Sequence, residues 1–172
     1  MLTTLQEEQF EKLYQLIEES FPRDEYRPYE TQRALLSELH YQIYVYEKDH
    51  EIAALFATWE GPQFVFLEHF AVKESFRNGG LGSKLLQVFL KQEEKPIVIE
   101  IEPPEGEIEK RRARFYERNG FILSRWDDYV QPALAKGQSP VPLVLMSYPK
   151  TLQEQEYQSF KNWVFKHVYS SY

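Results

Sequence analysis

The sequence of 172 residues contains no cysteine. This absence excludes disulfide bonds, thiolate catalysis and cysteine-based metal sites. No apolar run approaches the roughly 20 residues that span a bilayer, and residues 1–4 show no basic region of the kind that opens a signal peptide. Basic residues are also few, with 20 Lys and Arg against 27 Asp and Glu. We therefore expect a cytoplasmic protein that binds neither membranes nor nucleic acid.

The composition fits one globular domain that spans residues 1–172. Hydrophobic residues make up 42% of the chain and charged residues 27%, which is ordinary for such a domain. The net charge of −7 suits a cationic or amine substrate, although a solvated acidic surface explains it equally well.

Apolar residues recur at helical spacing near both ends of the chain. We expect a first helix that Thr3 or Thr4 caps and that ends at Phe21, and a second helix over residues 30–39. A charged helix is expected over residues 152–169. The positions expected to be buried on these helices are Phe10, Leu13, Tyr14, Ile17, Leu35, Leu36, Leu39, Tyr157, Phe160, Trp163, Val164 and Val168.

The middle of the chain has the pattern of a mixed sheet. Residues 41–46, 52–59 and 64–72 are separated by short polar turns and predict an antiparallel meander. The apolar run 97–102 is typical of a strand buried on both faces, so residues 64–102 predict a βαβ unit with two parallel strands. Other expected elements are a helix with Leu81, Leu85, Val88 and Phe89 on one face, a helix over 107–119 that ends at Gly120, a strand within 121–129, a loop over 132–142 and a last strand over 143–146.

A glycine-rich turn follows the third strand and opens the next helix. Free backbone N–H groups and the helix dipole favour an anion at such a place. Three nucleotide motifs were compared with it. The P-loop pattern fails because Gly82 is followed by Ser83 instead of lysine, and the dinucleotide pattern fails because Leu85 occupies the third glycine position. The pattern Arg/Gln-x-x-Gly-x-Gly/Ala is met in full by Arg77, Gly80 and Gly82.

That third pattern resembles the CoA-binding signature of the GNAT acetyltransferases. Residues 67–72 (Leu-Glu-His-Phe-Ala-Val) are similar to the fourth strand of this family, and residues 112–121 are similar to its Phe-Tyr-x-x-x-Gly-Phe block. The resemblance covers about residues 41–146. It implies the α/β (α+β) GNAT acyl-CoA N-acyltransferase fold, with a mixed central sheet of about six to seven strands flanked by helices. The first strand is expected to be short or missing, and the helix over 152–169 is an addition to this fold.

The resemblance also implies a reaction. An acetyl group would move from acetyl-CoA, without a metal, to a primary amine of a small molecule or peptide in a ternary complex. A ping-pong route through a cysteine thioester is excluded. The donor would lie along Phe70, Ala71, Val72, Arg77, Asn78, Gly79, Gly80, Leu81, Gly82 and Ser83, with a contact from Asn119 that a helix-end cap explains equally well.

Two residues carry the proposed proton transfers. Tyr116 matches the family tyrosine near the CoA sulfur and would act as general acid, with a packed aromatic residue as the alternative. Glu68 is the leading general base, because regular strand alternation would place it on one face with Phe70 and Val72. A structural carboxylate is the alternative for Glu68. Glu100, Glu102 or a water molecule could be the base instead.

The acceptor site is less defined. By resemblance it would lie between the first two helices and the loop before the last strand, with residues 21–29, Tyr44, Tyr46, Tyr129 and 131–142 as candidates. Ordinary packing explains each of them as well. The C-terminal helix would cover a sheet edge or form a homodimer contact. A non-catalytic acyl-CoA-binding sensor or interaction module is the alternative function, and the two failed motifs argue against a nucleotide-binding regulator.

Overall fold

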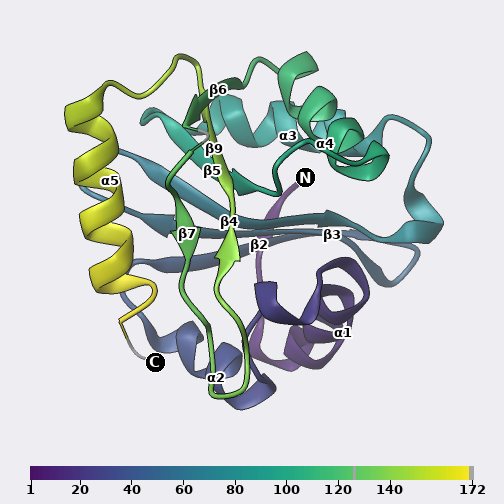
Figure 1. Ribbon diagram of the computed structural model, residues 1–172. Coiled ribbons are helices and arrows are strands. Elements are labelled where there is room, and N and C mark those ends of the chain that lie inside the picture. Colours follow the sequence, from purple (N-terminus) through teal and green to yellow (C-terminus); the bar gives the residue numbers. More distant parts are fainter. Residues whose placement is uncertain (126, 171–172) are drawn as a thin grey trace.

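The computed structural model describes residues 1–125 and 127–170. The expected strand over 121–129 therefore includes one position, Trp126, that lies outside the described residues, and residues 171–172 of the expected domain also lie outside them. Within the described part, seven strands form one mixed sheet in the order β1-β2-β3-β4-β5-β9-β6, and β7 and β8 form a separate hairpin (Figure 1). The strands are β1 (Thr3–Thr4), β2 (Tyr41–Lys48), β3 (Glu51–Glu60), β4 (Val65–Val72), β5 (Ile97–Ile101), β6 (Ile122–Arg125), β7 (Val130–Gln131), β8 (Val141–Pro142) and β9 (Val144–Tyr148).

Helices cover both faces of this sheet. On one face α1, α2 and α5 pack over a core cluster that includes Phe10, Trp59 and Phe160. On the other face α3 and α4 pack over a second cluster that includes Phe56 and Phe89. This arrangement confirms the predicted mixed sheet of six to seven strands with flanking helices and an extra C-terminal helix. The helices are α1 (Phe10–Ser20), α2 (Tyr29–Ala34), α3 (Leu81–Gln92), α4 (Glu107–Arg118) and α5 (Glu154–His167).

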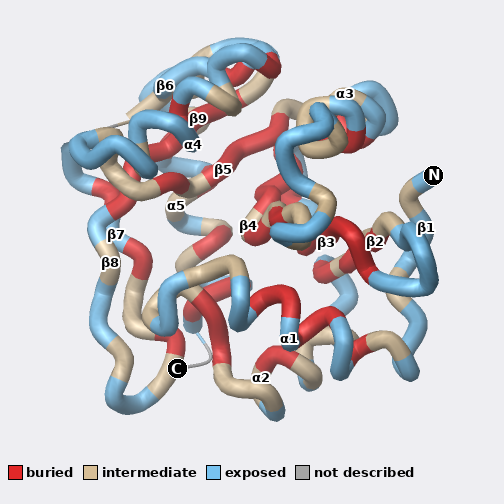
Figure 2. Tube along the Cα trace, turned by 90° about the vertical axis from the view of Figure 1, so that its right-hand side faces the viewer, coloured by how far each residue is buried: buried red, intermediate tan, exposed pale blue. Residues whose placement is uncertain are grey.

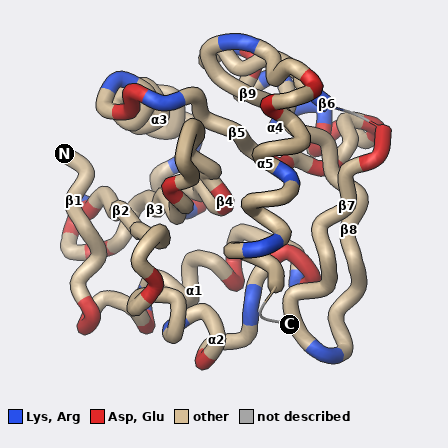
Figure 3. The backbone as a smooth tube through the Cα atoms, turned by 90° about the vertical axis from the view of Figure 1, so that its left-hand side faces the viewer, with Lys and Arg blue, Asp and Glu red and all other residues tan. Residues whose placement is uncertain are grey.

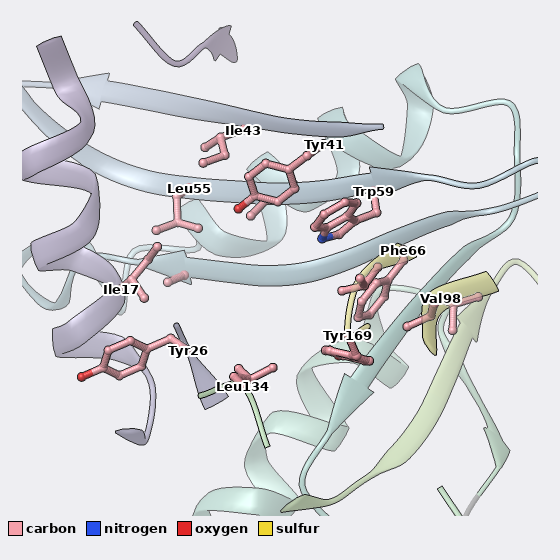
Figure 4. Packing of buried hydrophobic residues seen from close by; sticks show 14 of the residues in the cluster. Ile17, Tyr26, Tyr41, Ile43, Leu55, Trp59, Phe66, Val98, Leu134 and Tyr169 are labelled. Carbon is pink, nitrogen blue, oxygen red and sulfur yellow. The ribbon is translucent and has the colours of Figure 1, made fainter. Parts of the chain in front are cut away.

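The core follows the central strands. Figure 2 shows buried positions along β3, β4 and β5, and eight of the ten residues of β3 are buried on both faces of the sheet. Figure 4 shows part of the first cluster, in which Tyr41 and Trp59 from neighbouring strands lie together above Phe66. Burial on two faces explains why the apolar runs of these strands are nearly continuous.

The two predicted supersecondary units are both present. β2, β3 and β4 pair antiparallel, as the meander predicts. β4 and β5 pair parallel, which confirms the βαβ unit around α3. Gly120 follows α4 with a positive φ of 94°, as expected for the residue that ends a helix.

The start of the chain differs from the prediction. Thr3 and Thr4 do not cap a helix, because they form β1 and pair with Val45 and Tyr44 at the edge of the sheet. The first helix begins later, after a 3-10 turn over Glu7–Gln9. The side chains of Gln6 and Gln9 cap this turn reciprocally. Side-chain amides therefore form the cap in place of the expected threonine hydroxyls.

Several helix and strand boundaries also differ. The second helix ends at Ala34 and continues only as a 3-10 turn over Leu35–Ser37, and Leu39 is 88% exposed because the chain turns there to enter β2. Val88 is exposed on α3 instead of facing the core. Trp163 is half-buried at the edge of the first cluster. The expected loop over 132–142 ends in β8, which pairs with β7.

In the part of the chain that the structure describes, no helix combines the length and the apolar character needed to cross a membrane.

Candidate active site

A cleft opens where two parallel strands separate. β4 and β5 pair at three positions, and the last pair joins Leu67 to Ile99. Both strands continue beyond it, to Val72 and Ile101. The cleft has a volume of about 750 Å³ and is lined by the separated ends of β4 and β5, the start of α3, one side of α4, and residues of α1 and the following loop. Ligands of open α/β sheets bind at such a separation, outside the carboxyl ends of the strands.

The end of the cleft at the start of α3 has backbone groups that favour an anion. Gly80 is the N-cap of α3 with a left-handed φ of 77°, and no side chain caps this helix. The first-turn N–H groups of Leu81, Gly82 and Ser83 therefore have no intrahelical acceptor, and all three residues line the cleft. A Cβ at Gly82 would lie 3.6 Å from Phe115, an ordinary contact, so the packing of the protein itself does not require glycine there.

Four arginine side chains line the cleft. Arg77 Nε donates a hydrogen bond to the carbonyl of Val72 at 2.8 Å, which ties the glycine-rich turn to the end of β4. Arg111, Arg112 and Arg118 line the cleft from α4, where Figure 3 shows basic positions along the helix. Arginine suits phosphate groups because its planar fork binds two oxygens at once.

Tyr116 lies on α4 and lines the same cleft. Its ring packs edge-on against Phe115 and Phe121, with centroid distances of 5.3 and 5.4 Å. Burial raises the pKa of Tyr116, with an opposing contribution from Arg112. The phenol is therefore protonated at neutral pH and able to donate its proton.

A β-bulge interrupts β4 at Glu68. Ala57 of β3 pairs with His69, and the next residue, Thr58, pairs with Leu67, so Glu68 has no partner in this ladder. The predicted alternation is therefore wrong at this point. Glu68 and His69 contact the α1–α2 side of the sheet, whereas Phe70 stacks on Phe56 on the other side. Bulges redirect side chains in this way and are common next to active sites.

The carboxylate of Glu68 is paired with Arg27 and also accepts a hydrogen bond from Trp59. Oε1 accepts hydrogen bonds from Nη1 of Arg27 at 3.0 Å and from Nε1 of Trp59 at 2.9 Å. Oε2 lies 2.9 Å from Nη2 of Arg27. Burial alone would raise the pKa of Glu68, but the charge of Arg27 and these hydrogen bonds lower it below the ordinary value. The ionised form of Glu68 is thus stabilised, and the lowered pKa makes this carboxylate a weak proton acceptor.

His69 fills the space beside Glu68. Its Nε2 donates to the carbonyl of Glu25 at 2.8 Å, and its ring lies 4.7 Å from that of Phe21. Burial lowers the pKa of His69, so the ring is neutral and joins β4 to the loop after α1.

Four other carboxyl groups line the cleft, those of Glu19, Glu25, Glu100 and Glu102. Burial raises the pKa of Glu100 to about 8. Burial, with a smaller contribution from the negative charge of Glu102, raises the pKa of Glu25 to about 7. Glu102 instead forms an ion pair with Arg112 at 2.9 Å. Glu25 and Glu100 are therefore the cleft carboxyls poised to exchange protons near neutral pH.

The structure brings most of the predicted site residues together. Asn119 is an exception, because its side chain links α3 to α4: Nδ2 donates to Ser83 and to the carbonyl of Phe115, and Oδ1 accepts from Gln87. Neither Asn119 nor Gly79 is among the residues that line the cleft. The predicted residues that do line it are Glu68, Phe70, Ala71, Val72, Arg77, Asn78, Gly80, Leu81, Gly82, Ser83 and Tyr116.

The two predicted acceptor segments lie side by side. Gln131 donates to the carbonyl of Asp24 at 3.0 Å, and Gln138 donates to the carbonyl of Tyr26 at 3.1 Å. Of the single candidates, Tyr129 is buried near Glu100. Tyr44 and Tyr46 instead pack against the cluster under α3 and α4.

Arg27 and Glu25 lie within the predicted acceptor range 21–29, but the sequence analysis did not single them out as functional residues. Both lie in the Pro22–Pro28 loop, where no periodic pattern marks a buried position. Within residues 1–125 and 127–170, no group of His, Asp and Glu side chains could hold a metal ion.

Comparison with known proteins decides the family. Residues 39–123 match the family model described as "Acetyltransferase (GNAT) domain". The chain is 31% identical over 145 residues to "Putative acetyltransferase YjbC" of Bacillus subtilis (strain 168), covering 83% of this chain and 73% of that protein. The chain belongs to the GNAT acetyltransferase family.

Solved structures agree with this GNAT assignment. A Bacteroides thetaiotaomicron structure titled "Putative acetyltransferase from GNAT family" has a TM-score of 0.88 and 29% identity, with 98% of each chain covered. A GNAT acetyltransferase from Elizabethkingia anophelis, solved with acetyl-CoA bound, has a TM-score of 0.57 and 20% identity, and covers 86% of this chain and 95% of that one. The second likeness supports the fold alone.

Proposed function

We propose that this protein is an N-acetyltransferase that moves an acetyl group from acetyl-CoA to a primary amine of a small molecule or peptide. One observation carries the proposal. A single cleft joins the uncapped start of α3, the separated ends of β4 and β5, and the hydroxyl-bearing Tyr116. These are the three parts that phosphate binding, thioester binding and protonation of a leaving thiolate require.

The residues present fit acetyl-CoA. The N–H groups of Leu81, Gly82 and Ser83 would bind the pyrophosphate, with arginines nearby to balance its charge. The part of β4 from Phe70 to Val72 has no partner on the β5 side, so pantetheine would bind there as an added strand does. A GNAT neighbour with acetyl-CoA bound supports this donor. Direct contacts from Gly79 and Asn119 stay predictions.

The reaction proceeds by direct attack in a ternary complex. The amine nitrogen forms a bond to the acetyl carbon, and the carbon–sulfur bond breaks. The amine loses one proton to a base, and the departing thiolate takes one from the hydroxyl of Tyr116. Backbone N–H groups at the open edge of β4 would stabilise the oxyanion.

The base is a carboxylate of the cleft. The role predicted for Glu68 would require protonation of an anion that Arg27 and Trp59 hold with three contacts. Of the other candidates from the sequence, which are Glu100, Glu102 and water, Glu102 is paired with Arg112, whereas Glu100 lacks a cationic partner among the groups that shift its pKa. We therefore favour Glu100 for this step.

The acceptor is proposed to enter between the Pro22–Pro28 loop and the start of β7. Glu25, Glu100 and Glu102 line this side of the cleft, so a protonated amine would be attracted. It would release one proton to water to become the neutral nucleophile, and the base takes the second proton during the attack. Thiol release from acetyl-CoA across a panel of primary amines tests the function. Release that depends on the amine supports an enzyme, whereas tight binding of acetyl-CoA with no release under any amine supports a sensor.

A further inference from the structure

The C-terminal end of the chain reaches the candidate acceptor site. α5 is followed by Val168 and Tyr169, both almost fully buried. The carbonyl of Val168 accepts a hydrogen bond from Nη2 of Arg27 at 3.4 Å, and the hydroxyl of Tyr169 donates to Oε1 of Glu100 at 2.7 Å. Figure 4 shows Tyr169 beside Val98, the residue of β5 that lies two positions before Glu100. Val168 and Tyr169 lie outside the segment that matches the family model, residues 39–123.

Glu100 is the first residue of β5 beyond its pairing with β4. It follows Ile99, which forms the last pair with β4, so its side chain belongs to the part of the strand that has separated. Oε1 is held by Tyr169, while Oε2 makes no hydrogen bond within residues 1–125 and 127–170. One oxygen of the carboxyl group is therefore fixed, whereas the other is shielded from solvent and has no hydrogen-bond donor of regular geometry among the described residues.

The groups around Glu100 come from four elements. The hydroxyls of Tyr129 and Tyr169 and the carboxylates of Glu68 and Glu25 all influence its pKa, and Arg27 neutralises Glu68. Tyr129 makes no hydrogen bond of regular geometry among the described residues. The hydroxyls of Tyr129 and Tyr169 both lower the pKa of Glu100 against the effect of burial, and Tyr169 is the one of the two whose hydrogen bond to the carboxyl group has regular geometry.

We propose that Tyr169 is a positioning residue of the acetyl transfer, which holds Glu100 so that this carboxylate takes the proton of the acceptor amine. The inference rests on the proposed function and adds a task for the C-terminal helix, which delivers the tyrosine. The hydroxyl donates to the ionised carboxylate and so favours it. Replacing Tyr169 with phenylalanine keeps the buried ring and removes only this hydrogen bond.

The helix that precedes Tyr169 offers a matched control. Tyr157 of α5 also donates its hydroxyl to a carboxylate, that of Asp128, at 3.1 Å. Neither residue lines the cleft. Tyr157→Phe therefore makes the same chemical change, on α5 instead of just after it, without touching Glu100.

The first experiment titrates Glu100 directly by NMR, with 13C-labelled glutamate and Glu100→Gln to assign the signal. Tyr169→Phe should raise the pKa of Glu100 by about one unit, since a hydrogen bond to a charged group is lost. Tyr157→Phe should leave it unchanged. An unchanged titration in Tyr169→Phe, or an equal shift in both variants, would overturn the inference.

The second experiment measures kcat/KM against pH with the fastest amine of the panel. In Tyr169→Phe the pH below which kcat/KM falls should increase by the same amount as the pKa of Glu100 measured by NMR. The value of kcat/KM should therefore be about tenfold lower at pH 7 and should recover at a pH above the pKa values of both proteins. Glu100→Gln should lower kcat by about 100-fold or more. A pH dependence of kcat/KM that does not follow the NMR shift, or a Glu100→Gln variant with undiminished kcat, would refute the role of Glu100. Absence of thiol release by the wild-type protein with every amine is a separate result, because it refutes the proposed function before any variant is compared.

Discussion

Nη2 of Arg27 lies 2.9 Å from Oε2 of Glu68, and both side chains are shielded from water, with exposures of 0% and 3%. This pair joins the loop after α1 to the bulge in β4, beside the cleft. Its position explains why Glu68, which the sequence marks as a base, is a weak proton acceptor: the charge of Arg27 stabilises its ionised form.

The first prediction concerns this ion pair. Arg27→Met should lower the free energy of unfolding by about 3–5 kcal/mol, because it leaves the buried carboxylate of Glu68 without its cation. Urea denaturation monitored by tryptophan fluorescence measures the loss. Lys95→Met, which breaks the surface pair with Glu60, is the control and should cost far less. Equal losses in the two variants would show that the Arg27–Glu68 pair does not depend on burial.

The sequence predicts the framework well because the signals are local. The runs of β2 to β5, the glycine-rich turn and the amphipathic α3 each have a pattern of their own. The bulge at Glu68 has none, since one extra residue in a ladder depends on the partner strand. Arg27 lies in a loop without periodicity. Its burial depends on pairing with the carboxylate of Glu68, which is 41 positions away in the sequence.

The ends of elements were less predictable for the same reason. Thr3 and Thr4 have good N-cap side chains, but pairing with β2 decides their conformation. The sequence placed Leu39 in a helix, but the chain has to turn there to enter the sheet. Such competition between local preference and tertiary pairing is settled only by the fold.

A second prediction concerns the general acid. Tyr116→Phe should lower kcat by about 100-fold or more, because the leaving thiolate loses its proton donor. Affinity for acetyl-CoA, measured by calorimetry, should remain close to the wild-type value since the ring is retained. A loss of donor binding in this variant would mark Tyr116 as a structural residue instead.

A third prediction concerns Gly82. Gly82→Val should abolish binding of acetyl-CoA, because a branched side chain would occupy the surface that the pyrophosphate approaches. Folding should survive, since a Cβ meets only ordinary contacts at 3.6 Å. Calorimetry and thermal unfolding separate the two effects. A folded variant that binds acetyl-CoA with unchanged affinity would rule out close approach of the donor at Gly82.

The pH dependence of stability gives a fourth prediction. Burial raises the pKa of Glu100 to about 8 from its ordinary value of 4.5, so the folded state favours the protonated form. Its contribution to stability is complete below pH 4.5 and is lost as the pH rises to about 8. Glu100→Gln should therefore flatten the fall in Tm between pH 5 and 8.

Glu25 titrates in the same window, with a pKa of about 7, so part of the fall should remain in Glu100→Gln. Glu105→Gln, which changes an exposed acid, is the control and should keep the wild-type slope. Burial lowers the pKa of His69, which adds a rise in Tm over this range to every one of these proteins, so the test compares their slopes. A slope in Glu100→Gln equal to that of the wild type would contradict the protonated state assigned to Glu100.

The central claim is that the cleft at the start of α3 binds acetyl-CoA, and thermal unfolding with added ligands tests it most directly. The proposal predicts that CoA and acetyl-CoA raise Tm while ATP and NAD do not, with a stabilisation of about 2.7 kcal/mol at 100 times Kd. Stabilisation by ATP or NAD, with no effect of CoA or acetyl-CoA, would contradict it.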